Sequence, residues 1–333
     1  MAKRDIIVIG ASAGGVYALK ELVAGLPADF GASIFIVQHV SPHAPSLLPK
    51  ILEHVGYLPV HHPEDGELVQ PGHIYVAPPD HHLLIEYDQV IVKKGPKENR
   101  FRPSIDALFR SAAYRYGSRV IGVVLTGLLD DGTSGLWTVK RLGGLGIIQS
   151  PEDALYASMP RSVLEYVEVD HIVPMSEMAE LLVELTQQPA PEQPVIEEEE
   201  ASRLEAEINI AAQDNAFNMG ILDMGALTPL TCPECNGSLV SIKEGKIIRY
   251  RCHTGHAFTA SSLLAEVSKT VEENLWKSVK SLEETIILLE QSGKVLSEGN
   301  NETAQEYFAK AKETRKRSDV LRNFIFEQHK FDS

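Results

Sequence analysis

Along the first 185 residues, short unbroken apolar runs alternate with runs in which apolar side chains recur every three or four positions. Unbroken runs rich in valine and isoleucine are typical of strands buried on both faces of a parallel sheet, and the wider spacing is typical of helices. The predicted strands cover residues 6–9, 33–37, 73–77, 83–85, 90–92, 120–125, 146–149 and 171–173, and the predicted helices cover 16–25, 47–54, 104–116, 133–142 and 176–185. This alternation indicates an α/β fold with a doubly wound, mostly parallel, Rossmann-like sheet, and residues 83–92 are expected to add an antiparallel edge.

The pattern changes after residue 186. Residues 187–201 combine three prolines with a run of four glutamates, a composition that cannot bury a core and predicts a linker. A short helix is expected over residues 202–212, and longer helical spacing covers 261–290 and 302–328. Residues 293–301 are expected to break these two helices and form an antiparallel helical hairpin.

The first apolar run ends in a glycine-rich turn, residues 10–15, that leads into a predicted helix. Such a turn can hold the pyrophosphate of a dinucleotide, but Ser12 replaces the second glycine of that fingerprint, and the next strand ends in Gln38-His39 instead of an acid. The spacing Gly10-x-Ser12-x-Gly14 fits a nucleophile elbow, which lifts a serine hydroxyl above the carboxyl edge of a sheet. His39 falls at the same edge, so Ser12 and His39 are predicted to share a site.

Composition and charge limit the class of protein to which this chain can belong. A chain with 44% hydrophobic and 23% charged residues is ordinary for a globular protein. The longest apolar runs are only strand-length and no signal-peptide pattern precedes the first strand, so we expect a cytoplasmic protein that is not membrane-embedded. The net charge of −15 argues against a nucleic-acid partner, which would need clustered lysine and arginine.

All three cysteines lie in one short segment. Cys232 and Cys235 are two residues apart, Cys252 follows after sixteen more, and His253 and His256 close the segment. An odd number of cysteines in this arrangement fits a metal site in a reducing compartment better than a disulfide framework. We predict a structural zinc site held by Cys232, Cys235, Cys252 and His256, with His253 as the alternative fourth ligand.

The predicted organisation has four parts. A doubly wound domain covers residues 1–186 and the linker covers 187–201, followed by a zinc-ribbon-like module over 202–259 and the helical hairpin over 260–333.

A serine–histidine pair needs an acidic group to orient the imidazole. The best candidate is Asp131, because it follows the predicted strand 120–125 in a second strand-to-helix turn. The other interpretation of this aspartate is a helix cap.

Seven separated segments carry a family resemblance. They are Gly10-Ala-Ser12-Ala-Gly-Gly, Gln38-His39, Glu64-Asp65-Gly66, Pro71-Gly72-His-Ile-Tyr75-Val-Ala77-Pro78, Arg102-Pro103-Ser104-Ile-Asp106-x-Leu108-Phe109, Leu125-Thr-Gly127-x-x-x-Asp131-Gly132 and Ser158-Met159-Pro160-Arg161. In this order, over residues 4–186, they resemble the catalytic domain of the chemotaxis protein-glutamate methylesterases (CheB-type).

The resemblance implies that Ser12 is the nucleophile, His39 the general base and acid, and Asp131 the group that orients His39. It implies hydrolysis of glutamate methyl esters on the cytoplasmic domains of chemoreceptors, with methanol release through an acyl-serine. No cofactor is implied for catalysis, and some family members also deamidate receptor glutamines.

The resemblance also implies that the backbone N–H groups of Ala13 and Leu128 hold the oxyanion. This chain departs from the family pattern at both positions, where threonine and methionine are usual, and at Leu129, where glycine is usual. Many members carry an N-terminal receiver domain, for which Ser12 leaves no room, so a stand-alone enzyme is expected. The Cys-Pro-x-Cys segment and helical tail resemble the C-terminal extension of some stand-alone relatives.

The roles of several other polar residues are considered next. Arg102 and Arg161 could position substrate or form structural ion pairs. The histidine pairs 61–62 and 81–82 are expected to be solvated loop positions.

The sequence therefore predicts a carboxyl-ester hydrolase of chemotaxis-like signalling. The alternative is a catalytically weak signalling adaptor that binds receptors through the esterase fold. The C-terminal helices could form a homo-oligomer or dock a partner, or their apolar stripe could pack only on itself and on the ribbon.

Overall fold

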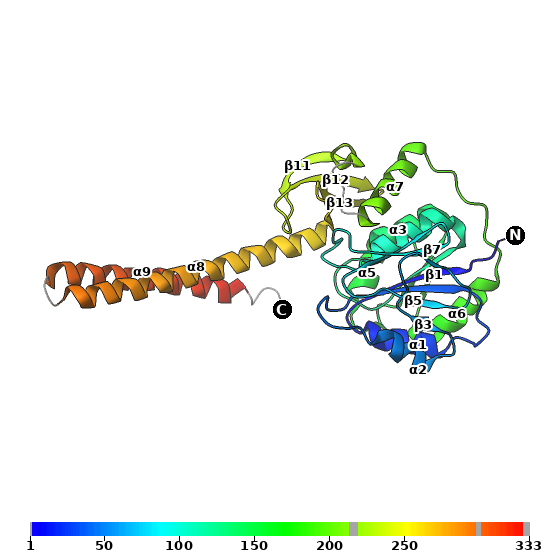
Figure 1. The fold of residues 1–333 in the computed structure, drawn as a ribbon, viewed down its shortest axis with the longest axis horizontal. Helices are drawn as coiled ribbons and strands as arrows, with labels where there is room; N and C mark the ends of the chain where they lie inside the picture. Colours follow the sequence, from blue (N-terminus) through cyan, green and yellow to red (C-terminus); the bar gives the residue numbers. More distant parts are fainter. Residues whose placement is uncertain (1, 213–218, 298–300, 329–333) are drawn as a thin grey trace. The chain divides into compact units, whose positions relative to one another are not determined.

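The computed structural model describes residues 2–212, 219–297 and 301–328, and it divides into two compact units, residues 1–263 and 264–333. A seven-stranded parallel sheet, in the order β10-β9-β8-β1-β2-β5-β3, forms the centre of the first unit (Figure 1). Its strands are β1 (Ile6–Ala11), β2 (Ser33–Gln38), β3 (Val60–His61), β5 (Ile74–Val76), β8 (Val120–Val124), β9 (Leu145–Gln149) and β10 (His171–Val173). The predicted doubly wound α/β fold is confirmed.

Helices cover both faces of this sheet. Ile7 and Ile9 of β1 belong to the apolar cluster under α1, α2 and α6, whereas Ile6 and Val8 belong to the cluster under α3, α4 and α5. Because β1 is buried on both faces, it has the unbroken apolar run seen in the sequence. The helices are α1 (Gly15–Ala24), α2 (Leu48–Val55), α3 (Ile105–Tyr116), α4 (Thr133–Arg141), α5 (Ser158–Tyr166) and α6 (Met175–Gln187).

The hairpin predicted at residues 83–92 forms but does not join the main sheet. Strands β6 (His82–Glu86) and β7 (Gln89–Lys93) pair with β4 (Glu67–Leu68) in a separate antiparallel sheet of three strands. The prediction of an antiparallel edge on the parallel sheet is therefore wrong. The partner of β7 comes from an earlier loop, which alternation within the hairpin cannot reveal.

A second antiparallel sheet contains the cysteine segment. Its four strands are β11 (Ala226–Thr231), β12 (Ser238–Glu244), β13 (Ile247–Cys252) and β14 (Ala257–Thr259), and we call residues 226–259 the ribbon. Helix α7 (Glu198–Ala212) precedes it and begins inside the segment predicted as a linker. Three glutamates in the first turn of α7 suit the positive end of the helix dipole, so the acidic run starts this helix.

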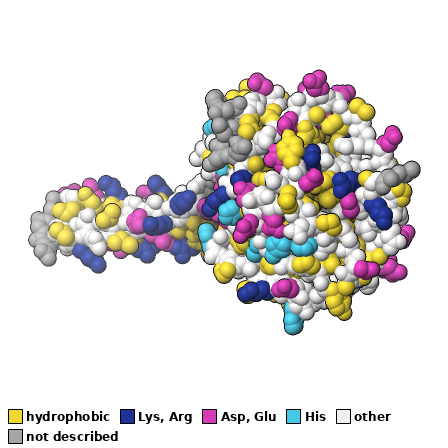
Figure 2. Space-filling view, turned by 45° about the vertical axis from the view of Figure 1, so that its right-hand side comes forward, with side chains coloured by type: hydrophobic (Ala, Val, Ile, Leu, Met, Phe, Trp, Pro, Cys, Tyr) yellow, Lys and Arg dark blue, Asp and Glu magenta, His cyan; other side chains and the backbone are white. Residues whose placement is uncertain are grey.

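The second unit is an antiparallel pair of helices. Helix α8 (Ala260–Leu296) starts in the first unit, and α9 (Asn301–Gln328) returns beside it. The Trp276 and Phe326 rings contact each other with centroids 5.8 Å apart, and Arg315 bonds Glu290 at 2.7 Å. Helix α8 continues through Gly293, where a break was expected, and residues 298–300 of the predicted break lie outside the described residues. Figure 2 shows apolar side chains between charged ones along this hairpin.

Buried ion pairs join the ribbon to α7 and to the domain of the parallel sheet. Arg251 of β13 donates to Glu98 at 2.6 Å, and Arg249 donates to Glu207 of α7 at 2.7 Å. Glu98 also accepts from Arg110 of α3 at 3.1 Å. All of these side chains are at most 2% exposed. Removal of one partner would leave an uncompensated buried charge, so the cluster holds the two modules in one arrangement.

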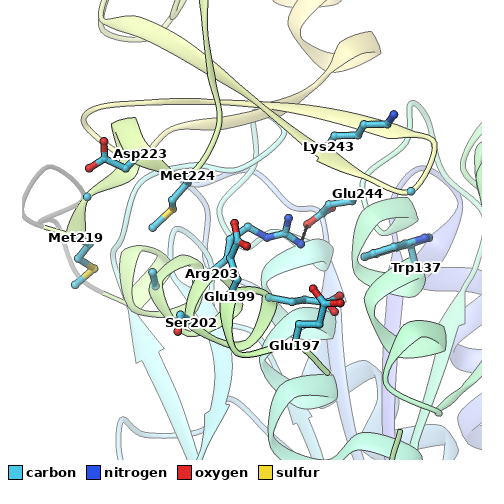
Figure 3. Close-up of a pocket in the computed structure, with 14 residues that line it drawn as sticks. Trp137, Glu197, Glu199, Ser202, Arg203, Met219, Asp223, Met224, Lys243 and Glu244 are labelled. Carbon is cyan, nitrogen blue, oxygen red and sulfur yellow. Dashed lines mark ion pairs between the residues drawn. The ribbon is translucent and has the colours of Figure 1, made fainter. Parts of the chain in front are cut away.

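The edge of this ion cluster opens into a pocket (Figure 3). There Arg203 of α7 pairs with Glu244 of β12 at 3.8 Å, and Trp137 of α4 lies against the β12–β13 turn. A Cβ added to Gly245 would lie 2.9 Å from the Trp137 indole nitrogen, and Gly245 has a φ of 58°. Within the described ranges, no helix is long and apolar enough to cross a membrane.

Candidate active site

Three neighbouring strands of the parallel sheet end in the predicted site residues. Ser12 follows β1, His39 follows β2, and Asp131 lies in the turn after β8. Because β8, β1 and β2 are adjacent and parallel, their carboxyl ends meet at one edge. Residues separated by as many as 119 positions therefore converge at the topological switch of the sheet.

Glycines shape the turn around Ser12. Gly14 has a φ of 78°, in the left-handed region, and allows the chain to turn sharply into α1. Gly127 packs against Ser12 so closely that an added Cβ would lie 2.8 Å from the serine Cβ and 2.0 Å from the Met159 sulfur. The Ser12 carbonyl accepts a hydrogen bond from Gln38 Nε2 at 2.8 Å. These contacts fix the loop that carries Ser12 against the end of β2.

The structure brings Ser12, His39 and Asp131 into one hydrogen-bonded chain. Ser12 Oγ lies 3.2 Å from His39 Nδ1, and His39 Nε2 lies 2.9 Å from Asp131 Oδ2. In the neutral tautomer that fits these partners, Nε2–H donates to the carboxylate and Nδ1 is free to accept the serine proton. The arrangement can therefore transfer a proton from the serine hydroxyl to the histidine.

Asp131 is held at the amino terminus of α3. Its carboxylate accepts hydrogen bonds from the Ile105 N–H at 2.8 Å, the Asp106 N–H at 3.2 Å and the Ser104 hydroxyl at 2.9 Å. Burial acts to raise the pKa of Asp131, but the hydrogen bond and charge of His39 and the backbone donors hold this pKa below its ordinary value. Asp131 thus stays ionised beside His39, and it accepts bonds from another helix instead of capping its own.

Two further side chains that contact His39 and Asp131 were not predicted. The Phe101 ring stacks on His39 with centroids 3.7 Å apart, and Asn99 Nδ2 donates to Asp131 Oδ1 at 2.9 Å. The Asn99 side-chain oxygen in turn accepts the Thr259 N–H of the ribbon at 3.0 Å. Asn99 therefore links the ribbon to Asp131. These residues precede the Arg102-Pro103-Ser104 motif, and no local pattern in the sequence marks them.

The two predicted oxyanion donors are free in the described part of the chain. The N–H groups of Ala13 and Leu128 have no hydrogen-bond acceptor there. Ala13 directly follows Ser12, and Leu128 follows Gly127, which packs against Ser12. Leu129 has a φ of 63°, the left-handed conformation that favours glycine. The turn that follows Leu128 therefore keeps a glycine-type backbone although the side chain is leucine.

The structure gives different surroundings to Arg102 and Arg161, whose roles the sequence left undecided. Arg102 pairs with Asp80, with Nε 2.9 Å from Oδ1, and donates to the Gly95 carbonyl at 2.6 Å, as a structural ion pair does. Arg161 is exposed and lines a cleft beside Leu128. His82 was expected in a solvated loop, but it is fully buried in β6 and accepts the Ser104 N–H at 3.3 Å.

The predicted metal ligands form a cluster in the ribbon. One ligand atom from each of Cys232, Cys235, Cys252 and His256 lies within 4.8 Å of every other. Cys235 and Cys252 have their sulfurs 3.7 Å apart, and His256 Nδ1 lies 3.6 Å from the Cys252 sulfur. Tetrahedral zinc with Zn–S bonds of about 2.3 Å would place its sulfur ligands about 3.8 Å apart, so the donor set fits that ion. His253, the alternative ligand, is not in the cluster.

A doubly wound parallel sheet with serine, histidine and aspartate at the ends of three adjacent strands defines an α/β serine hydrolase. The CheB methylesterase family matches residues 7–182, more than half of the chain, and this chain belongs to that family. The family resemblance predicted from the sequence is confirmed.

Relatives of known name and structure match the same region. A Leptospira interrogans relative is 42% identical over 184 residues, which cover 55% of this chain and 95% of its own length. The Thermotoga maritima protein-glutamate methylesterase/protein-glutamine glutaminase is 38% identical over 184 residues, and the match covers 54% of each chain. The crystal structure of the Thermotoga maritima CheB methylesterase catalytic domain aligns with a TM-score of 0.53, over 56% of this chain and 99% of that one.

Proposed function

We propose that this protein is a protein-glutamate methylesterase that acts on the cytoplasmic domains of methylated chemoreceptors. The hydrogen-bonded chain from Ser12 through His39 to Asp131 is the observation that carries this proposal. Ser12 is the nucleophile, His39 is the general base and acid, and Asp131 orients His39. The names of the relatives support the substrate class and a second reaction, deamidation of glutamine.

The reaction follows acyl transfer. His39 takes the proton of Ser12 as its oxygen attacks the ester carbonyl, and the Ala13 and Leu128 N–H groups stabilise the oxyanion. His39 then protonates the departing methoxide, so that methanol leaves and an acyl-serine remains. Water, deprotonated by His39, releases the glutamate carboxylate. The same steps on a glutamine side chain release ammonia, and neither reaction needs a cofactor.

The test is methanol release from a methylated receptor fragment by the full-length protein. We expect release by the wild type and a loss of at least about 10³-fold in Ser12→Ala, because the Ser12 hydroxyl is the one within hydrogen-bond distance of His39 Nδ1 among the described residues. Thr126→Ser is a control that keeps the hydroxyl that donates to the Ala13 carbonyl, and it should stay active. Absence of release from the wild type would favour the adaptor alternative.

We further propose that the ribbon binds one structural zinc ion through Cys232, Cys235, Cys252 and His256. The fit of their spacing to a tetrahedron supports this assignment. Four protein ligands leave no position for water, so zinc would stabilise the fold and take no part in ester hydrolysis. The modules that we propose are the catalytic domain over 1–186, the linker over 187–201, whose last four residues form the start of α7, the zinc-ribbon module over 202–259 and the helical hairpin over 260–333.

We also propose that the hairpin associates with a second copy or a signalling partner in the cytoplasm. Several apolar side chains of α8 and α9 are exposed, including Leu288 at 63% and Val320 at 70%. Such exposure on both helices is more than a self-contained helical pair requires. Light scattering of the wild type and of the double variant Leu288→Lys/Val320→Lys distinguishes a self-associating hairpin from a monomeric one.

A further inference from the structure

A cleft of about 780 Å³ lies beside the candidate active site, and both modules of the first unit line it. The catalytic domain contributes the turn at Leu128 and the segment at Tyr156, which leads into α5. The ribbon contributes Lys246 and Ile248, and Ser261 comes from the start of α8. A cavity of this size is in the range of built binding sites.

The catalytic side of the cleft begins next to the nucleophile. Leu128 follows Gly127, which packs directly against Ser12. Leu155, on the same side, has its Cβ 3.2 Å from the position that a Cβ on Gly14 would take. The catalytic side of the cleft is therefore formed by residues next to the loop that carries Ser12.

The lining combines apolar and positively charged groups. Leu128, Leu155 and Ile248 are 51%, 68% and 46% exposed, so apolar side chains from both modules face solvent at one place. Such a concentration marks an interaction surface. Arg161 and Lys246 add exposed positive charge from the two sides, and Glu165 adds one exposed negative charge. The Asp130 carboxylate also lines the cleft, but it is only 9% exposed and accepts hydrogen bonds from Thr259 and Ser261.

The ribbon wall is anchored next to the triad. Thr259 Oγ1 donates to Asp130 at 2.9 Å, and the Ser261 hydroxyl makes a second bond to the same carboxylate. Lys97 pairs with Glu234 of the ribbon at 3.0 Å. The wall is thus fixed by bonds to the residue that precedes Asp131. In the sequence, the residues of this ribbon wall come after the region that matches the CheB methylesterase family, which ends at residue 182.

We propose that the ribbon forms one wall of the cleft that binds the protein substrate, with Ile248 and Lys246 as specificity-determining residues. The occupant is an amphipathic, acidic segment of the substrate protein that carries the esterified glutamate. Its apolar side chains pack on Leu128, Leu155 and Ile248, and its acidic side chains lie toward Arg161 and Lys246. This inference rests on the proposed esterase activity.

The test compares two substrates on the full-length protein. The protein substrate is a methylated receptor fragment, assayed by methanol release, and the small substrate is p-nitrophenyl acetate, which is too small to span the cleft. We expect Ile248→Ser to lower kcat/KM for the receptor about tenfold relative to that for the acetate. Lys246→Glu should lower the same ratio about threefold, with a smaller effect at high salt.

Leu227→Ser is the matched control, because Leu227 is an exposed apolar residue of the same ribbon, on β11, outside the cleft. It should leave the ratio of the two kcat/KM values unchanged. An unchanged ratio in Ile248→Ser and Lys246→Glu, or an equal fall for both substrates, would contradict the proposed role of the ribbon in substrate binding. Neither result would contradict the proposed esterase activity. Wild-type protein inactive on both substrates would overturn the proposed function and this inference with it.

Discussion

Leu129 combines a side chain and a backbone conformation that rarely occur together. Its φ of 63° costs a non-glycine residue about 1 kcal/mol or more, and the position lies between Leu128, a proposed oxyanion donor, and Asp131 of the proposed triad. The fold tolerates this cost because the turn is fixed on both sides. Asp106 accepts the Gly132 N–H at 2.9 Å, and Ser158 donates to the Leu129 carbonyl at 3.3 Å.

Replacement of Leu129 should therefore separate two contributions to the free energy of unfolding, the strain of the left-handed backbone and the loss of the leucine side chain. We expect Leu129→Gly to be more stable than Leu129→Ala by about 1 kcal/mol, because both remove the leucine side chain and only glycine relieves the strain. Denaturant unfolding of the two variants measures this difference. Equal free energies of unfolding would mean that the left-handed turn carries no strain.

At the scale of elements, much of the site could be predicted because the carboxyl ends of parallel strands lie at one edge of the sheet. The apolar runs of β1, β2 and β8 located three strands. Ser12 and His39 directly follow β1 and β2, and Asp131 lies in the turn after β8. The site's supporting residues could not be predicted in this way. Asn99 and Phe101 lie in a loop whose place depends on β14, where the Asn99 N–H donates to the Ala257 carbonyl at 2.8 Å. That pairing joins residues 158 positions apart and leaves no local signal.

Two other predictions differ from the structure for separate reasons. Periodicity predicted the β6–β7 hairpin but not its pairing with β4, since alternation does not identify the neighbouring strand. The acidic run at residues 198–200 resembles a solvated linker in composition, yet its position at the start of a helix is favourable for charge. Cysteine spacing was more informative, because a metal site requires its ligands to meet at one point.

The cluster of Cys232, Cys235, Cys252 and His256 should affect the active site through β14. We expect Cys232→Ser to lose the bound zinc and to lower kcat/KM for p-nitrophenyl acetate about tenfold, because a loosened β14 no longer holds the loop of Asn99 and Phe101. Elemental analysis and the esterase assay measure the two effects. His253→Ala should keep both zinc and activity, since His253 lies outside the cluster. Zinc loss with full activity would show that the loop holds its position without the ribbon.

For the first compact unit as a whole, stability depends on the ion cluster between the ribbon and the catalytic domain. Burial acts to raise the pKa of Glu207, but Arg249, Arg110 and Arg251 overcome it and lower this pKa to about 2. A carboxylate whose pKa falls on folding contributes stability above its unfolded value of about 4.5 and loses it as the pH falls toward 2. The cluster should therefore weaken in acid while remaining intact at neutral pH.

Glu207→Gln tests this linkage directly. We expect the variant to lose about 3 kcal/mol of unfolding free energy at pH 7, because buried guanidinium groups of Arg249 and Arg251 lose a compensating charge. The difference from the wild type should shrink as the pH falls from 5 toward 2, since the wild-type glutamate then becomes neutral as well. Denaturant unfolding at pH 7, 5, 4 and 3 measures the trend. Glu266→Gln, on α8 outside the cluster, is the control, and a difference that stays constant with pH would mean that Glu207 stabilises the protein through packing alone.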